Sequence, residues 1–448
     1  MPELRQVEFE PAPLGRFRPL LGERFAEIEN AAAGAREAFA GRRIWHLNST
    51  AQGGGVAEML RALLPYVRDA GVDTRWLVLP ETDGFFAVTK RIHNRLHGHS
   101  GDEGRLDDAA RATYERALAW STERLRETVD PKDVVYLHDP QTAGLVPALK
   151  QAGSAVIWRC HIGVDRPNDV AREAWDFLRP YVAEADAYVF SRREYLWEGL
   201  DEDRAWFMPP VIDPFSPKNE EMDAERIGSV LAAVQEKATI VEEAPVPEDA
   251  PAVAQVSRWD RLKDPRGLLE VFEHHLRHPS AHLVLVGPDS EGVSDDPEGA
   301  AVYREVVEHW RGMSDACRAR SHLISLPMDD LERNARMVNA LQRRAEVIVQ
   351  KSLAEGFGLT VAEAMWKARP VVASRVGGIQ DQVVDGRTGT LVEDPRDLPA
   401  FARAIEAILG DRERCEAMGR AGQERVRDNY LAVDRLREYV GLVESLIR

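Results

Sequence analysis

The chain has 448 residues, which is long enough for two α/β domains and too long for one ordinary core. Its 58 Lys and Arg against 75 Asp and Glu give a formal net charge of −17, which argues against nucleic acid and anionic lipid as partners. Three scattered cysteines exclude a disulfide framework, and no long apolar run predicts a membrane span or a signal peptide. We therefore expect a cytoplasmic enzyme that could still bind a small phosphorylated ligand.

The first half of the chain alternates short apolar runs with amphipathic stretches. It begins with a strand at Ile44–Leu47, a glycine loop at Gly53–Gly55, a helix to about Asp69 and a strand at Thr74–Leu79. Further strands are expected at Val134–Leu137, Ala155–Arg159 and Ala187–Phe190. This rhythm predicts a parallel sheet with helices on both faces.

The rhythm breaks between Pro217 and Pro251, in an acidic segment that ends in prolines. It resumes with strands expected at Ala252–Val256, His282–Val286, His322–Leu326, Val347–Gln350 and Pro370–Ala373, separated by helices. We therefore predict a first domain at 1–215, an interdomain connection at 216–251 and a second domain at 252–429. Two doubly wound domains that face a cleft are the expected architecture.

The strongest local signal is the string KSLAEGFGLTVAEAM at 351–365. Gly356 and Gly358 let the backbone approach a ligand, and the helix that follows offers free N–H groups to phosphate oxygens. Glu355 can accept hydrogen bonds from two sugar hydroxyls, and Glu363 can reach a second diol such as a ribose. An ordinary corner with a capping carboxylate is the alternative, but the two glutamates together favour a sugar nucleotide.

A basic loop precedes this element, with Arg258 and Lys263 between a strand and the helix expected from Pro265. A diphosphate leaving group gains negative charge as the glycosidic bond breaks, and two cations could replace a divalent metal there. A solvated basic loop is the alternative, which the later glutamates make less attractive. We expect no metal and no other cofactor, and we interpret the D-x-D string at 201–203 as surface.

The first half of the chain carries weaker signals. The glycines at 53–55 lack the dinucleotide fingerprint but permit close approach to a phosphate or sugar. His161 follows a strand, at the edge of the sheet where ligands bind in open α/β folds. A histidine that only packs in the core is an equally good interpretation of His161.

Taken in order, these motifs resemble the retaining glycosyltransferases of family four. Longer strings resemble the trehalose glycosyltransferring synthases of that family: HLNSTAQGGGVAEML at 46–60, FFAVTK at 85–90, HDPQ at 138–141 and EGFGLTVAEAMWK at 355–367. The resemblance extends from about Arg43 onwards. It implies a GT-B fold, with two Rossmann-like domains around a deep cleft and a final helix at about 430–448 that crosses back to the first domain.

The resemblance also implies roles for individual residues. It assigns catalysis to Arg258, Lys263, Glu355 and His161, where the two cations hold the donor diphosphate. Donor contacts would also come from Gly54, Gly55, Gly356, Phe357, Gly358, Leu359 and Glu363. The acceptor side would include Lys90, His93, Asn94, His138 and Asp139.

The implied reaction transfers glucose from a nucleoside diphosphate to free glucose, without metal and with retention, to give α,α-trehalose. The partners would be the sugar nucleotide and glucose, with a homodimer as an open possibility. Glucose 6-phosphate stays open as acceptor, because Lys90, Arg91 and Arg95 are close in sequence. A phosphorylase of the same fold, a sugar-nucleotide epimerase and a non-catalytic sensor also stay open, as do the base, the direction of flux and the oligomeric state.

Overall fold

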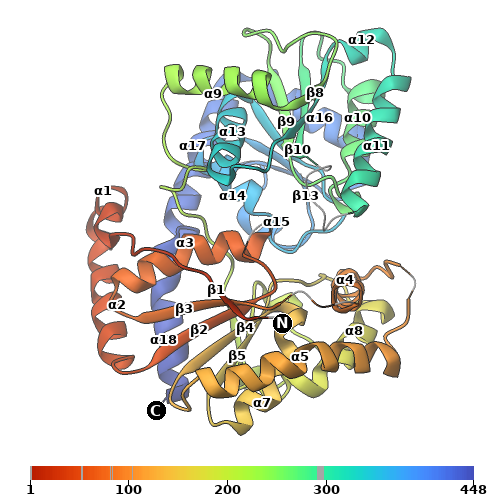
Figure 1. The fold of residues 1–448 in the computed structure, drawn as a ribbon. Helices are drawn as coiled ribbons and strands as arrows, with labels where there is room; N and C mark the ends of the chain where they lie inside the picture. Colours follow the sequence, from red (N-terminus) through yellow and green to blue (C-terminus); the bar gives the residue numbers. More distant parts are fainter. Residues whose placement is uncertain are drawn as a thin grey trace. The chain divides into compact units, whose positions relative to one another are not determined.

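The computed structural model describes residues 3–51, 54–80, 82, 84–102, 104–289 and 297–447. The chain divides into two compact units: Met1–Val211 with Leu431–Arg448, and Ile212–Tyr430. Each unit holds a seven-stranded sheet, parallel except for one edge strand, with helices on both faces (Figure 1). The α/β class and the pair of Rossmann-like sheets are confirmed, whereas a cleft between the units stays a prediction.

The sheet of the first unit has the strand order β1-β3-β2-β4-β5-β6-β7. The strands are β1 (Arg5–Gln6), β2 (Arg43–Asn48), β3 (Asp73–Val78), β4 (Val134–His138), β5 (Ala155–Cys160), β6 (Ala187–Phe190) and β7 (Ala205–Phe207). Central strands such as β4 are buried on both faces, which explains their continuous apolar sequences. The order reverses at β2 and β4, since β3 lies on one side of β2 and all later strands lie on the other.

Helices cover both faces of this sheet (Figure 1). One face carries α2 (Phe25–Ala38), α3 (Gly55–Asp69) and α18 (Leu436–Ile447), and the other carries α4 (Phe85–Leu96), α5 (Asp108–Thr128), α7 (Val146–Gln151) and α8 (Asp169–Val182). Two short helices are α1 (Arg18–Leu21) and α6 (Asp139–Thr142). The last helix, α18, packs against α2, so the end of the chain belongs to the first unit.

The sheet of the second unit has the order β14-β13-β12-β9-β10-β11-β8. The strands are β8 (Thr239–Val241), β9 (Ala252–Val256), β10 (His282–Pro288), β11 (Ser321–Leu326), β12 (Val347–Gln350), β13 (Val371–Ser374) and β14 (Thr390–Val392). Here the order reverses between β9 and β12. In open parallel sheets, ligands bind outside the carboxyl ends of the strands at such a reversal.

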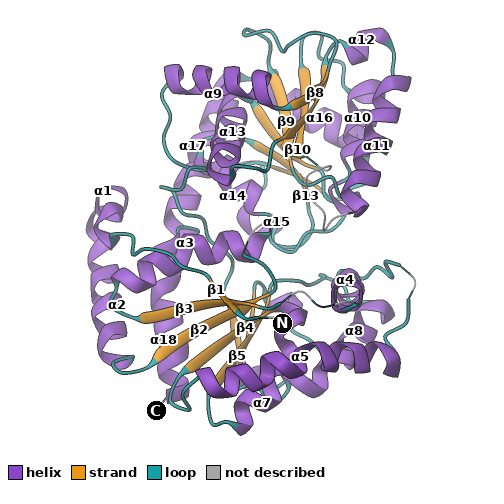
Figure 2. Cartoon of the chain, in the orientation of Figure 1, coloured by secondary structure: helices purple, strands orange, loops and turns teal. Residues whose placement is uncertain are grey.

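The helices of the second unit also form two layers (Figure 2). One face carries α10 (Pro265–Glu270), α11 (Pro297–Gly312) and α16 (Leu398–Leu409), and the other carries α9 (Ala224–Lys237), α13 (Leu331–Arg344), α14 (Leu359–Trp366) and α17 (Arg412–Asn429). The short helices are α12 (Asp315–Arg318) and α15 (Ile379–Gln382). Among the one-turn 3-10 helices, η6 (Arg261–Lys263) precedes α10 and η8 (Ala432–Arg435) precedes α18.

The segment 216–251 differs from the expected interdomain connection, because it is part of the second unit. Helix α9 packs against α13, and β8 pairs antiparallel with β11 at the edge of the sheet. The strand has only three residues and α9 buries one apolar side chain, Val234. A short edge strand among charged residues carries little apolar pattern, so the sequence did not indicate it.

Candidate active site

Two loops of the second unit follow neighbouring strands at the reversal of strand order. One follows β9 and carries Lys263, and the other follows β12 and carries Glu355. Because β9 and β12 are parallel, their carboxyl ends lie at the same edge of the sheet. The ammonium of Lys263 forms an ion pair with the carboxylate of Glu355, and the two side chains are 17% and 11% exposed. The structure thus joins two predicted catalytic residues that lie far apart in sequence.

Arg258 lies on the same loop as Lys263 but has a different environment. Its guanidinium donates a hydrogen bond to the carboxylate of Asp260 at 2.8 Å, and its side chain is about half exposed. Lys263 therefore pairs with a residue of the loop after β12, whereas Arg258 pairs with a residue of its own loop.

A second ion pair at these loops was not predicted. The buried ammonium of Lys351 pairs with Asp264, and the N–H of Lys351 donates to the side-chain oxygen of Gln255 at 3.0 Å. Asp264 adopts a left-handed backbone with φ of 45° and caps α10 by accepting from the N–H of Gly267. A buried charge is tolerated only with a partner, so the pair fixes the two loops together. The sequence feature that could have indicated this pair is a lysine directly after a buried strand.

The turn between Glu355 and α14 requires a glycine at one position. Gly358 has φ of 84°, and a Cβ there would lie 3.1 Å from Ile379 and 3.3 Å from the side chain of Glu355. The hydroxyl of Ser352 also donates to Glu355, at 3.2 Å. These contacts fix the position of the carboxylate next to the start of α14.

The backbone of the predicted donor contacts from Gly356 to Leu359 is held by its neighbours. The carbonyl of Gly356 accepts from the N–H of Gly378 at 3.1 Å, and the carbonyl of Phe357 accepts from Gln382 at 2.5 Å. Leu359 is the first residue of α14, whose free N–H groups can bind an anion.

Glu363 lies on α14 and is buried, with only 3% of its surface exposed. The ammonium of Lys218 lies 3.5 Å from its Oε1 atom. The sequence predicted Glu363 as a ribose ligand but gave no indication of Lys218.

In the first unit, the predicted glycines lie at the start of α3. Gly54 precedes the helix and Gly55 is its first residue, whereas Gly53 lies outside the described residues. Among the described residues, no atom lies within 4 Å of a Cβ placed at Gly54. The described neighbours leave space at this helix N-terminus, and the approach of a ligand there stays a prediction.

Three histidines form a row on the face of the first sheet that carries α18. The Nδ1 atom of His46 lies 3.1 Å from Nε2 of His138, and Nδ1 of His138 lies 3.2 Å from Nε2 of His161. The neighbouring rings are stacked, with centroids 5.4 Å and 5.5 Å apart. The three residues lie on adjacent strands or just after them, so strand order brings them together. His46 was not predicted.

The environment of this histidine row keeps its rings uncharged. Burial and the nearby Arg159 guanidinium lower the pKa of His46 to about 3. Burial, with the same guanidinium adding to it, holds the pKa of His138 and of His161 well below the usual value. A neutral imidazole carries one N–H, so the two hydrogen bonds of the row couple the tautomers of all three rings.

The acceptor-side candidate Asp139 adjoins this row. Its carboxylate accepts from the N–H of His161 at 2.7 Å, and its backbone φ is 62°. Burial raises the pKa of Asp139 to about 7. Lys90, His93 and Asn94 lie on α4, which packs against α6, the short helix that begins at Asp139. The structure thus gathers His138, Asp139 and His161 and places the other three on a neighbouring helix.

The described part of the chain shows no group of three or more His, Cys, Asp or Glu side chains that could hold a metal ion. Within the same residues, no helix has the length and apolar character needed to cross a membrane.

Known proteins match the chain along its length. A family model described as trehalose synthase, N-terminal domain, matches residues 46–197, and one described as glycosyl transferases group 1 matches residues 236–425. The trehalose synthase of Rubrobacter xylanophilus is 38% identical over 449 residues, with 99% of each chain covered. The chain belongs to the trehalose synthase family.

This trehalose synthase family member also resembles more distant proteins. A trehalose phosphorylase of Pleurotus sajor-caju is 27% identical over 78% of this chain and 50% of its own length. The crystal structure of an α,α-trehalose-phosphate synthase (UDP-forming) from Burkholderia vietnamiensis superposes with a TM-score of 0.69 at 17% identity, covering 90% of this chain and 98% of the other. The predicted glycosyltransferase family and the GT-B fold are confirmed.

Proposed function

We propose that this trehalose synthase family member is a retaining glucosyltransferase that joins glucose from a nucleoside diphosphate to free glucose, forming α,α-trehalose. The observation that carries the proposal is the Lys263–Glu355 pair at the reversal between β9 and β12. It puts a cation suited to a diphosphate beside a carboxylate suited to sugar hydroxyls, at the edge where ligands bind in such sheets. The trehalose synthase name of the relative that is 38% identical supports the choice of product.

On the donor side, Lys263 and Arg258 would stabilise the charge that develops on the departing diphosphate. Glu355 would hold hydroxyls of the transferred glucose, and Glu363 the ribose. The chain's own cations would thereby serve where other transferases use a metal, so the proposed reaction is metal-free.

On the acceptor side, His161, at the end of the row, and Asp139 would hold an uncharged hexose through hydrogen bonds, and the buried His46 and His138 would orient the ring of His161. The attacking hydroxyl would bond to the anomeric carbon on the face that the diphosphate leaves. The bond from that carbon to the phosphate oxygen would break, and the departing phosphate would take the proton of the attacking hydroxyl. The anomeric configuration would be retained, because the new bond forms on the same face of the sugar as the bond that breaks.

The test is to incubate the purified protein with a panel of α-linked nucleoside diphosphate glucoses and with either glucose or glucose 6-phosphate. Proton NMR of the product should show α,α-trehalose with glucose as acceptor. Turnover only with glucose 6-phosphate would contradict the acceptor assignment, and a β linkage at the transferred glucose would contradict the mechanism.

A trehalose phosphorylase is the second candidate, because a protein of that name is 27% identical over 78% of this chain. The two activities differ in the co-substrate that turnover requires. A phosphorylase would release glucose 1-phosphate from trehalose and inorganic phosphate without any nucleotide, whereas the proposed transferase would need a nucleoside diphosphate.

A further inference from the structure

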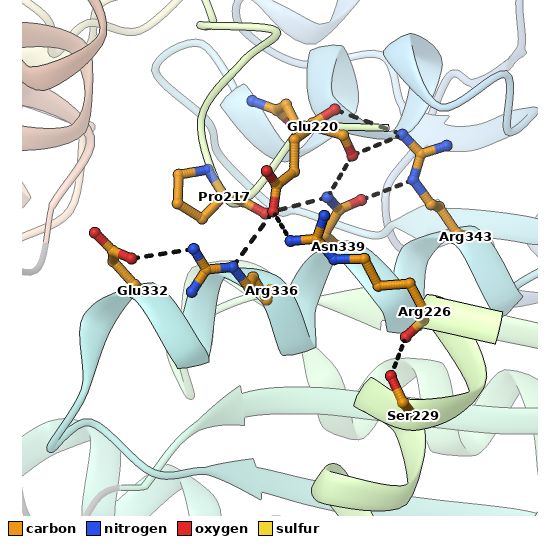
Figure 3. Close-up of polar contacts among 9 residues, drawn as sticks. Pro217, Glu220, Arg226, Ser229, Glu332, Arg336, Asn339 and Arg343 are labelled. Atoms are coloured by element: carbon orange, nitrogen blue, oxygen red, sulfur yellow. Dashed lines mark hydrogen bonds and ion pairs between the residues drawn. The ribbon is translucent and has the colours of Figure 1, made fainter. Parts of the chain in front are cut away.

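The segment 216–221 lies between the first residues of the second unit and α9, and side chains of α13 hold it in place (Figure 3). The amide of Asn339 donates to the carbonyls of Pro217 and Glu220, at 3.1 Å and 2.9 Å. Arg343 donates to the carbonyl of Glu220 at 3.1 Å and to the oxygen of Asn339 at 2.9 Å. Asn339 is buried, so these bonds satisfy a polar side chain that water cannot reach.

Side chains of α14 and its end hold the same segment from a second direction. The indole N–H of Trp366 donates to the carbonyl of Asn219 at 3.1 Å, and Lys367 donates to the side-chain oxygen of Asn219 at 2.9 Å. Lys367 also donates to the backbone carbonyl of Glu363 at 3.1 Å. Asn219 in turn donates to the carbonyl of Asp213 at 3.0 Å. A buried network of this kind is stable only when its members are satisfied, so it specifies one position for the segment.

The consequence of this network is the position of Lys218. Its two neighbours in sequence, Pro217 and Asn219, are both hydrogen-bonded to the helices, and its ammonium lies 3.5 Å from Oε1 of Glu363. Glu363 is buried, and a buried carboxylate is costly without a cation. Lys367 donates to the backbone carbonyl of Glu363, and burial lowers the pKa of Lys367 although the charge of the nearby Glu363 carboxylate raises it in part.

We propose that Lys218 is a positioning residue for the nucleoside of the donor: it holds the carboxylate of Glu363 oriented to accept hydrogen bonds from the two hydroxyls of a ribose. This inference rests on the proposed function, in which Glu363 binds that ribose. One carboxylate oxygen faces Lys218, so the ion pair fixes the rotation of the group. A carboxylate held in this way distinguishes a ribose from a 2′-deoxyribose, because the missing hydroxyl leaves it partly unsatisfied.

The experiment measures the affinity of UDP, ADP and GDP by calorimetry, then compares the tightest of them with its 2′-deoxy form. The unaltered protein should bind the ribonucleotide about tenfold more tightly, as expected for a hydrogen bond to a charged group. Lys218→Met should lower the affinity for the ribonucleotide about tenfold and abolish this preference, while the affinity for the deoxynucleotide stays nearly the same. Lys218→Arg should keep most of the preference for the ribonucleotide. The double variant with Glu363→Gln and Lys218→Met should bind both nucleotides about as tightly as Lys218→Met alone.

The matched control is Arg226→Met, since Arg226 pairs with Glu220, at the exposed side of the same segment, and not with Glu363. It should leave both affinities unchanged, and the thermal midpoints of both Met variants should be similar. If Lys218→Met keeps the preference, or weakens both nucleotides equally, the positioning role is wrong while the proposed function stands. If the unaltered protein binds none of the three nucleotides, the proposed function fails, and the role of Lys218 with it.

Discussion

The carboxyl edges of the two sheets differ in charge. The edge of the second sheet carries ion pairs between its loops, Lys263 with Glu355 and Lys351 with Asp264. The edge of the first sheet carries the neutral imidazoles of the histidine row, because burial and the nearby Arg159 lower the pKa of each ring. An edge of ion-paired side chains suits a diphosphate and an edge of neutral imidazoles suits a hexose, so the difference matches the proposed division between donor and acceptor.

A second histidine row shows what is particular about the first. In the second unit, Nδ1 of His282 lies 2.9 Å from Nε2 of His322, whose Nδ1 lies 2.7 Å from the carboxylate of Glu242. The carboxylate can only accept, so it fixes the direction of this row. The row lies at the amino ends of β10 and β11, away from the edge where ligands bind. Among the residues described, no carboxylate accepts a hydrogen bond from a ring of the first row, so no carboxylate fixes the tautomers of its rings in the same way.

The largest expected effect concerns the charged edge. Lys263→Ala should lower the turnover rate by roughly 10² to 10³, the loss typical of removing one group that stabilises charge in the transition state. Steady-state kinetics with varied donor and varied acceptor measures it. The control is Arg261→Ala on the same loop, an exposed side chain paired with Glu305, which should change turnover little. Equal losses in the two variants would contradict a specific role for Lys263.

The next effect separates the two histidine rows. His138→Gln breaks the row that reaches His161 and should lower turnover by up to about a hundredfold, because a misplaced group costs about that much. His322→Gln, in the row that reaches Glu242, should leave turnover close to that of the unaltered protein. ¹⁵N NMR of the imidazoles should also show a changed tautomer at His161 in the first variant alone. A similar loss of activity in both variants would mean that the rows serve stability only.

The third prediction concerns pH and the row at Glu242. Burial lowers the pKa of His322 from 6.5 to about 4. Between these values the unfolded chain binds a proton that the folded chain does not, so stability falls as the pH falls through this window. His322→Gln should reduce the slope of unfolding free energy against pH by up to about 1.4 kcal/mol per pH unit. Urea unfolding across the window measures the slope, and exposed His99→Gln should leave it unaltered.

The smallest expected effect is that of metal removal, because Arg258 and Lys263 supply the positive charge at the donor side. Turnover should be unchanged after exhaustive chelation, measured with the same assay before and after treatment. A loss that magnesium or manganese restores would be the contrary result. It would direct attention to Asp201 and Asp203, which the sequence analysis assigned to the surface.

The sequence by itself predicted the features that depend on neighbouring residues. The turn at Gly358 was predictable because a glycine before a helix provides both a left-handed backbone and free N–H groups. The alternation of apolar strands and helices was also predictable, because it depends on the pattern of apolar residues within each short segment. The family and the GT-B fold were predictable from continuous sequence motifs. The edge strand β8 and helix α9 were not, because so few of their side chains are buried.

Only the tertiary structure decided which loops and side chains meet. Lys351 meets Asp264 because β12 pairs with β9, and His46 meets His138 because β4 pairs with β2. Lys218 meets Glu363 because a buried amide network fixes the segment before α9. These contacts join residues that are far apart in the chain. They depend on strand order, which is determined by the burial of whole sheet faces and not by any one local sequence pattern.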